Sequence, residues 1–348
     1  MITLQRNQQQ FQVLHHSIGR LQRMPMLHLH NDYCSNKNVP KGSNRVNRQD
    51  WFANVSDAAV FDYIDKTPPL KEIKIYEKLS QKYNLPLLCG GWFYVLGRDE
   101  KLLFSHLKNG SHLGTQIHNV QIKYMHFEGY PVTNEEIVDI YLRSAEYGEK
   151  VGCIPCFEIH INMWSEDFLR IFEVADKIES YGIPFRMTLD HSHIIFKMNN
   201  EQEMKLFQLS EHIENKRIIL DPFQKDNLAQ KLIDKNYINL LHARSVIPNN
   251  PKNIKAKHPD GSIGRGVQYP FIKPLPGEYH SNWDESRLDS WKEVVKQLIY
   301  YHSQNEQSPL RYISTEFIPA TDYGEGNKYS LFENSVACAK WIKRLYSN

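Results

Sequence analysis

Residues 156–160 (CFEIH) and 188–193 (TLDHSH) decide the fold prediction, because each joins a short apolar run to carboxylate and imidazole side chains. Residues 241–244 (LHAR) and 314–316 (STE) repeat this arrangement further along the chain. Four strand-like segments therefore each carry acidic or histidine side chains at the C-terminal end. An α/β barrel places its catalytic groups at this end of its parallel strands, where the strand ends converge on one axis. The four segments together predict a functional site at the mouth of a barrel.

Apolar runs and amphipathic segments alternate along most of the chain, which predicts an α/β fold of the (β/α)8 TIM-barrel type. The step from Glu158 to Asp190 is 32 residues, close to one strand–helix unit of a barrel of about 250 residues. We expect an N-terminal extension (1–23), a single barrel domain (24–348) and a long loop (248–282) after the seventh strand. The eight expected strands are residues 24–30, 58–64, 85–95, 116–122, 154–161, 185–189, 237–241 and 311–317.

Between these strands, local signals predict loops and helices. Residues 31–50 are rich in Asn, Lys, Gly and Ser, which is typical of a loop. Thr133 and Glu136 have the spacing of a capping box and predict the start of a strong helix. Residues 201–215 have a helical pattern, whereas the strand-like residues 217–221 are followed at once by a proline and are not counted as a barrel strand.

Composition excludes several classes of protein. Of 348 residues, 41% are hydrophobic and 24% charged, which is ordinary for a globular protein. The formal net charge of +2 lacks the basic excess of a nucleic-acid-binding protein. Five cysteines, an odd number, argue against a disulfide framework, and we expect Cys153 and Cys156 to be inert core thiols. No apolar run approaches the roughly 20 residues of a membrane span, and the polar N-terminus lacks the apolar core of a signal peptide, so a cytoplasmic location is expected.

The candidate ligands offer carboxylate and imidazole groups without a thiolate. Such a set suits a hard or borderline divalent cation, here Mn²⁺, Mg²⁺, Co²⁺ or Zn²⁺. Three carboxylates and one imidazole nearly neutralise one such ion and leave positions open for substrate oxygens. Such a site suits an isomerase that forms an enediol, because the ion polarises a carbonyl while a carboxylate moves a proton. The competing interpretation is that Glu158 and Glu316 are structural carboxylates held in salt bridges.

The order of these motifs resembles the xylose-isomerase-like barrel superfamily, which includes sugar isomerases and epimerases, inosose dehydratases and apurinic endonucleases. The resemblance is clearest from about residue 114 to 320 and weak before residue 55. It rests on residues 145–152 (AEYGEKVG), 157–160 (FEIH), 189–193 (LDHSH), 241–244 (LHAR) and 315–316 (TE).

Within this superfamily, similarity to the ketose 3-epimerases implies roles for individual residues. It implies that one divalent metal ion is held by four residues: Glu158, Asp190, His242 and Glu316. Glu158 and Glu316 would also be the catalytic proton-transfer bases. His193 would contact a substrate hydroxyl, and Arg244 would bind a substrate oxygen or a phosphate.

Three further residues are predicted to bind substrate, and two of them, His160 and His258, have a plainer alternative. His160 follows Glu158 by two residues but could equally be a packing residue, as could His191. His258 lies in a Gly-rich segment (255–266) that could cradle a phosphate or simply form a turn. Trp92 is expected to form part of a pocket wall. The expected partner is a small carbohydrate, and homo-oligomerisation is left open.

Two rival functions use the same barrel. An apurinic-endonuclease-like phosphodiesterase would need an Asp where Ala256 stands, and additional histidines at earlier strand ends, where His126 is the one candidate. A non-catalytic sugar-binding barrel would be expected to have lost at least one of the four ligands. We therefore predict a metal-dependent isomerase or epimerase of a sugar or sugar derivative.

Overall fold

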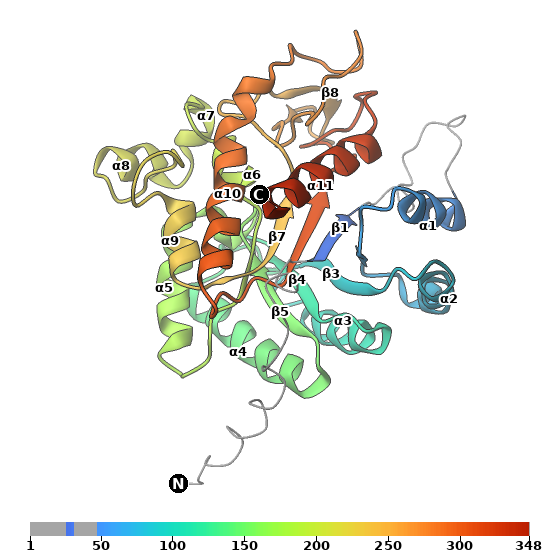
Figure 1. Ribbon diagram of the computed structural model, residues 1–348. Helices are drawn as coiled ribbons and strands as arrows, with labels where there is room; N and C mark the ends of the chain where they lie inside the picture. The colour runs from blue at the N-terminus through green and yellow to red at the C-terminus, as the bar shows by residue number, and fades with distance from the viewer. Residues whose placement is uncertain (1–25, 31–46, 348) are drawn as a thin grey trace.

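Eight parallel strands close into a barrel in the computed structural model, which describes residues 26–30 and 47–347 (Figure 1). Around the barrel the order is β1-β10-β7-β6-β5-β4-β3-β2. Barrel strands that are consecutive in sequence are therefore neighbours, and the first strand pairs with the last. The TIM-barrel prediction is confirmed. The barrel strands are β1 (Met26–His30), β2 (Tyr63–Asp65), β3 (Leu87–Tyr94), β4 (Ile117–Ile122), β5 (Ile154–Glu158), β6 (Met187–Leu189), β7 (Ile238–Ala243) and β10 (Tyr312–Glu316).

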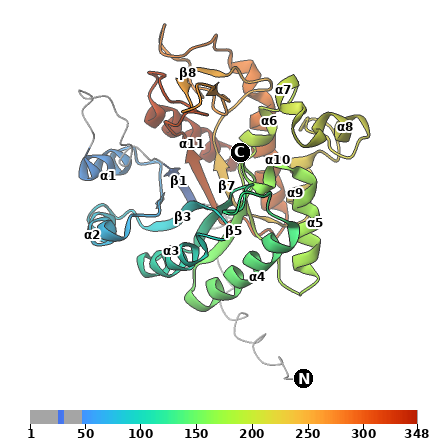
Figure 2. The same cartoon turned by 180° about the vertical axis from the view of Figure 1, so that it is seen from behind.

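Helices surround the barrel on the outside, as Figures 1 and 2 show. The α-helices are α1 (Arg48–Asp57), α2 (Ile73–Tyr83), α3 (Glu100–Leu113), α4 (Asn134–Val151), α5 (Phe168–Glu179), α6 (Ser192–Ile195), α7 (Glu201–Met204), α8 (Leu209–Glu214), α9 (Leu228–Asp234), α10 (Asp289–Gln304) and α11 (Leu331–Ser347). Short 3₁₀ segments are η2 (Leu70–Glu72), η3 (Trp164–Glu166), η4 (Leu206–Gln208) and η5 (Glu285–Leu288). The main apolar core lies between this helical ring and the strands.

The predicted capping box begins the longest helix. Thr133 accepts a hydrogen bond from the Glu136 backbone N–H, and Glu136 accepts one from the Thr133 backbone N–H. At the other end of α4, Gly148 lies so close to the chain that a Cβ would come within 2.6 Å of the Cys153 carbonyl oxygen. The glycine thus lets α4 pack tightly against the start of β5.

The barrel interior is built in layers, because alternate residues of a strand point to the same side. One buried apolar cluster fills the lower interior; its members are Tyr63, Cys89, Ile117, Cys156, Leu240 and Tyr312. Two residues further along each of these strands stands a member of a polar layer: Asp65, Gly91, Asn119, Glu158, His242 and Ser314. The side chains of the five polar members of this set, all except Gly91, are buried. The strand alternation therefore delivers polar groups directly above an apolar layer.

Several local predictions differ from the structure. Residues 31–46 of the expected loop 31–50 lie outside the described residues, and its last residues instead begin α1 at Arg48, where Asn47 accepts a hydrogen bond from the Asp50 backbone N–H. The expected strand 58–64 is reduced to β2. The expected helix 201–215 is broken into α7, η4 and α8, because Phe207 and Gln208 both adopt left-handed conformations, with φ of 53° and 54°. The expected extension 1–23 lies outside the described residues.

The long loop after β7 is not wholly irregular. It contains an antiparallel hairpin of β8 (Asn253–Lys257) and β9 (Ile263–Gly264). Asn253 donates hydrogen bonds to backbone carbonyls of Thr321, Tyr323 and Glu325, in the segment that follows β10. Figure 1 shows β8 on the side toward which β7 and β10 point. The hairpin therefore lies among the loops at the barrel mouth. In the described part of the chain no helix is long and apolar enough to cross a membrane.

Candidate metal centre

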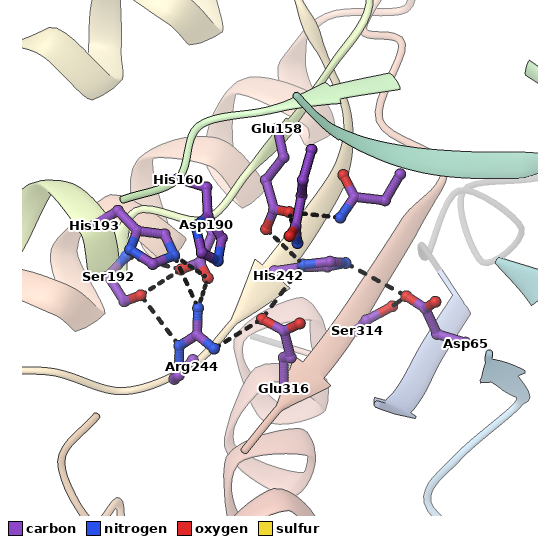
Figure 3. Close-up of polar contacts among 12 residues, drawn as sticks. Asp65, Glu158, His160, Asp190, Ser192, His193, His242, Arg244, Ser314 and Glu316 are labelled. Atoms are coloured by element: carbon purple, nitrogen blue, oxygen red, sulfur yellow. Dashed lines mark hydrogen bonds and ion pairs between the residues drawn. The ribbon is translucent and has the colours of Figure 1, made fainter. Parts of the chain in front are cut away.

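Four adjacent strands, β5, β6, β7 and β10, bring the four predicted ligands together (Figure 3). Glu158 and Glu316 end β5 and β10, Asp190 directly follows β6, and His242 lies near the end of β7. One ligand atom from each residue can be chosen so that all four atoms lie within 4.8 Å of one another. All four side chains are buried, Glu316 being the most accessible at 4%. The geometry therefore permits one ion to contact all four.

Glu158 is held by two amide groups from β4. Asn119 Nδ2 and Gln121 Nε2 both donate to Glu158 Oε2, at 2.6 and 2.5 Å. The other carboxylate oxygen, Oε1, faces His242 Nδ1 at 3.0 Å. The two amides thus fix the orientation of this carboxylate and leave Oε1 directed into the cluster.

His242 lies between carboxylates on both edges of its ring. Nδ1 faces Glu158 at 3.0 Å and Glu316 Oε2 at 3.4 Å, and Nε2 faces Asp65 Oδ2 at 3.4 Å. Burial alone would lower the pKa of His242, but the negative charges of Glu316 and Glu158 raise it well above its usual value. The ring therefore presents Nδ1 to the predicted ligands and Nε2 to β2.

Asp190 is embedded in a network that keeps it ionised. Ser192 donates to Asp190 Oδ1 from its backbone N–H at 3.0 Å and from its hydroxyl at 2.5 Å, and Arg244 Nη2 donates to Oδ2. Burial opposes the charged form, but the positive charges of Arg244 and His193 hold the pKa of Asp190 well below its usual range. Arg244 also pairs with Glu316, with Nη1 3.1 Å from Oε2. Its guanidinium thus joins two of the predicted metal ligands.

Aromatic and imidazole rings close over Arg244. The Tyr323 ring lies 4.2 Å from the guanidinium carbon, and its hydroxyl is 2.9 Å from His160 Nε2. The His160 and His193 rings lie 4.1 Å apart, and His193 Nε2 is 3.3 Å from Asp190 Oδ2. Burial and the neighbouring His193 lower the pKa of His160 well below its usual value, so this ring is neutral at pH 7. Tyr323, His160 and His193 therefore form one buried wall beside the cluster.

The donor set fits a divalent cation on charge as well as on geometry. Four buried carboxylates meet in this cluster: Glu158, Asp190, Glu316 and Asp65. Arg244 is the permanent cation among the described residues that contact them. Buried ionised groups require compensation by an opposite charge. Oxygen and imidazole donors without thiolate suit Mg²⁺, Mn²⁺, Co²⁺ or Zn²⁺.

Two predicted substrate-binding residues lie apart from this cluster. Trp92 pairs in register with Val120, on the helix-facing side of β3, and its ring contacts Phe93 and His106. His258 stands at the end of the hairpin strand β8, where Nε2 is 3.0 Å from Asp322 Oδ1. Trp92 therefore does not point into the barrel interior. The next residue on β3, Phe93, is the inward-facing one.

Other residues take the plainer of the roles considered for them. His191 packs against Trp291 and its Nε2 lies 3.1 Å from the Trp291 carbonyl oxygen. His126 stacks on Tyr130 outside the four-residue cluster. Burial raises the pKa of both Cys153 and Cys156 to about 12, so neither thiol is reactive at neutral pH.

The hollows on the helical ring, one of about 400 Å³ between α4 and α5, share no lining residue with the cluster.

A second buried ionic cluster fastens the β8–β9 hairpin to the loops after β5 and β6. Lys197 Nζ donates to Glu166 at 2.8 Å and to Glu203 at 2.9 Å. Arg265, from the hairpin, donates to Glu166 Oε1 at 2.5 Å and to Glu203 Oε1 at 3.0 Å. Two cations and two carboxylates thus pair with each other in full. This cluster is structurally separate from the candidate metal centre and links three loops at the barrel mouth.

This second cluster predicts a loss of stability in acid. Burial opposes ionisation of Glu166, but Lys197 and Arg265 lower its pKa to about 2. A carboxylate whose pKa is lowered by folding stabilises the fold above its unfolded pKa of about 4.3, and this contribution is lost as the pH falls toward 2. We expect Glu166→Gln to destabilise the protein at pH 7 by about 3–5 kcal/mol, since it breaks a buried pair.

Urea unfolding at several pH values measures this effect. The difference between wild type and Glu166→Gln should shrink steadily from pH 5 to pH 2. Glu149→Gln is the matched control, because Glu149 pairs with Arg186 at 3.1 Å on the surface and such pairs contribute about 0–1 kcal/mol. A Glu166→Gln difference that stays constant over this pH range would contradict the prediction.

Sequence reasoning missed residues that surround the ligands. Asp65, Asn119 and Gln121 lie on strands that the motif search did not treat as part of the site. The available signal was strand alternation, because each stands two or four residues beyond an inward-facing apolar residue. Tyr323 lies in an irregular segment after β10, and no periodicity could have placed it on Arg244.

The chain shares the fold of the xylose isomerase-like TIM barrels. No protein-family model matches the sequence, and no curated protein matches it. The chain therefore resembles known proteins only in its three-dimensional structure, and the low sequence identities show the fold and nothing more.

Three solved structures represent this similarity. A xylose isomerase-like TIM barrel protein from Mycobacterium smegmatis, in complex with magnesium, is 10% identical with a TM-score of 0.53, over 95% of this chain and 99% of its own. D-allulose 3-epimerase from Methylomonas sp. is 12% identical with a TM-score of 0.52, over 92% and 99% of the two chains. D-psicose 3-epimerase from Clostridium cellulolyticum H10, with D-tagatose, is 11% identical with a TM-score of 0.51, over 93% and 99%.

Proposed function

We propose that this protein is a divalent-metal-dependent isomerase or epimerase of a sugar or sugar derivative. The observation that carries the proposal is the convergence of Glu158, Asp190, His242 and Glu316 within 4.8 Å at the C-terminal ends of adjacent strands. Three of these four are carboxylates, and two of them, Glu158 and Glu316, would also accept and return a proton. Structural neighbours named as D-allulose and D-psicose 3-epimerases, and one complexed with magnesium, support the same class of reaction.

In the proposed reaction the protein removes a proton from a carbon of an α-hydroxy carbonyl compound and returns one either to the neighbouring carbon, in an isomerisation, or to the opposite face of the same carbon, in an epimerisation. A divalent ion bound by the four side chains would polarise the substrate carbonyl and the adjacent hydroxyl. Glu316, at the end of β10, would remove the proton from a carbon next to the carbonyl and leave an enediol. Glu158, at the end of β5, would deliver a proton to complete the isomerisation or epimerisation. The amides of Asn119 and Gln121 would keep Glu158 aimed into the cluster during this transfer.

The surrounding side chains would orient substrate and exclude water. His193 and Arg244 lie within the cluster and would donate hydrogen bonds to substrate oxygens, and His160 would support this wall. Tyr323 covers Arg244 and would have to move to admit substrate. Direct substrate contacts of Trp92 and His258 remain proposals that would require rearrangement of their present contacts. We further propose a cytoplasmic location, consistent with the four cysteines in the described residues, which are free and buried.

An activity screen in deuterated solvent tests the proposal. Protein freed of metal by chelation would receive Mn²⁺, Mg²⁺, Co²⁺ or Zn²⁺ singly, together with free and phosphorylated ketoses, and NMR would follow products. We expect conversion of at least one sugar with at least one ion, and no conversion after chelation. Nicking of abasic DNA without sugar conversion would instead favour the phosphodiesterase. Sugar binding without conversion of any substrate would favour a binding barrel.

A further inference from the structure

Asp65 is a buried carboxylate that no motif singled out, and it lies behind the ring of His242. It ends β2, two residues beyond Tyr63 of the apolar layer, and only 1% of its surface is exposed. Its Oδ2 atom is 3.4 Å from His242 Nε2, on the edge of the ring opposite to the one that faces Glu158 and Glu316 (Figure 3). Asp65 is thus outside the four-residue cluster but in direct contact with one member of it.

The contact determines which ring nitrogen can carry a lone pair. An ionised carboxylate can only accept hydrogen bonds, so the nitrogen that faces it must carry a proton. Nδ1 also faces a carboxylate, Glu158 Oε1 at 3.0 Å, and without an ion it carries a proton as well. An ion held by Glu158 and Glu316 would take the place of that Nδ1 proton, while the proton on Nε2 stays directed at Asp65. A histidine that ligates a metal commonly donates its other N–H to a carboxylate, which fixes ring orientation.

Asp65 is itself fixed by a buried chain of hydroxyl groups. Ser314 Oγ donates to Asp65 Oδ2 at 2.8 Å, and the Tyr63 hydroxyl lies 2.8 Å from Ser314 Oγ. Ser314 stands two residues before Glu316 on β10, and both side chains are inward-facing. The chain therefore joins β2, which carries Asp65, to the strand that carries one of the proposed ligands.

We propose that Asp65 is a positioning residue, which holds the His242 ring with its Nε2–H toward β2 and its Nδ1 toward Glu158 and Glu316. The metal-binding consequence of this role rests on the proposed function. The orientation of the ring does not, because it follows from contacts among the protein's own side chains. Loss of the Asp65 oxygen should free the ring to turn and so weaken the binding of a divalent ion.

Two substitutions separate hydrogen bonding from charge. Asp65→Leu and Asp65→Asn both remove the negative charge, but the asparagine keeps an oxygen that can accept from Nε2–H. We expect Asp65→Leu to weaken Mn²⁺ binding by about 10–100-fold, as for other residues that orient metal ligands, and Asp65→Asn to stay within about threefold of wild type. Asp62→Asn is the control, since Asp62 lies on the same segment and pairs with Lys343 on the outside. Calorimetric titration with Mn²⁺ gives the affinities, and thermal unfolding of the metal-free variants reports any general loss of fold.

A second readout needs no metal. In ¹⁵N-histidine-labelled, metal-free protein, the Nε2–H of His242 should give a slowly exchanging downfield proton resonance, assigned by its loss in His242→Asn. This resonance should persist in Asp65→Asn and disappear in Asp65→Leu. If wild type shows this pattern but binds no Mn²⁺, the proposed function fails and the positioning role stands. Equal loss of affinity in both variants, or a resonance unaffected by Asp65→Leu, would overturn the positioning role.

Discussion

Replacement of Glu316 by Gln is expected to lower turnover by about 10²–10⁴-fold, the usual contribution of a positioned general base. Glutamine keeps the side-chain volume and one oxygen that can contact an ion, but it removes the basic carboxylate. Metal and substrate affinities should therefore stay within a few-fold of wild type. Exchange of a substrate C–H hydrogen with deuterated solvent should be lost together with turnover. Single-turnover kinetics and NMR of the recovered sugar would measure both quantities.

Controls for Glu316→Gln come from its own surroundings. Glu316 Oε2 contacts Arg244 Nη1 at 3.1 Å, so thermal unfolding must confirm that the variant remains folded. Glu325→Gln is a matched substitution on the segment after β10, where Glu325 accepts a hydrogen bond from Thr321 Oγ1 and does not contact the cluster. Full turnover in Glu316→Gln would show that Glu316 is not the base. Absence of deuterium in the product of wild type would not remove the assignment, because a shielded proton can return to the carbon from which it came.

Asp190→Ala should abolish metal binding, the second large effect. Wild-type protein is expected to hold about one divalent ion per chain, and elemental analysis after dialysis would measure this. Asp190 supplies one of the four ligand positions, and its loss also leaves Arg244 with Glu316 as its remaining carboxylate partner in this cluster. The guanidinium would then compete with the ion for Glu316. We therefore expect no retained metal in this variant.

Stability must be separated from affinity in that experiment, since breaking a buried ion pair costs about 3–5 kcal/mol. Asp190→Asn keeps the volume and an oxygen that can accept from Ser192, and it should fold better while still binding the ion much more weakly. Ser192→Ala removes a hydrogen bond to Asp190 without removing a ligand and should retain most of the metal. Metal retained in full by Asp190→Ala would refute this ligand assignment. Three zinc ions in wild type would support the endonuclease-like alternative.

The four proposed ligands were predictable because each terminates an apolar run long enough to identify a buried strand. Their placement at the C-terminal ends follows from parallel strands, and the structure does bring them together. Asp65 was not predicted because the expected strand, residues 58–64, ended one residue before it. Asn119 and Gln121 lie inside a strand rather than at its end. Polar side chains inside a strand form no motif that the sequence search could recognise.

The remaining misses come from tertiary contacts that override local patterns. The pattern of residues 201–215 is helical, but the left-handed backbone of Phe207 and Gln208 interrupts it. Arg244 was expected to bind a substrate oxygen or a phosphate, and its pairing with Asp190 and Glu316 was not predicted. No spacing rule reveals such a pairing, because the three residues are separated in sequence and meet through the barrel's closure. Predictions at the level of strands were therefore more successful than predictions of individual contacts.

The two inward-facing layers have an evolutionary consequence. Residues such as Cys156 and Leu240 fill the lower interior, while Glu158 and His242 stand two residues further along the same strands. The upper layer can therefore vary while most of the side chains that fill the lower interior stay unchanged. Tyr63 is an exception, because its hydroxyl lies 2.8 Å from Ser314 Oγ in the upper layer. This arrangement lets single-residue changes at strand ends alter reaction chemistry without loss of the fold.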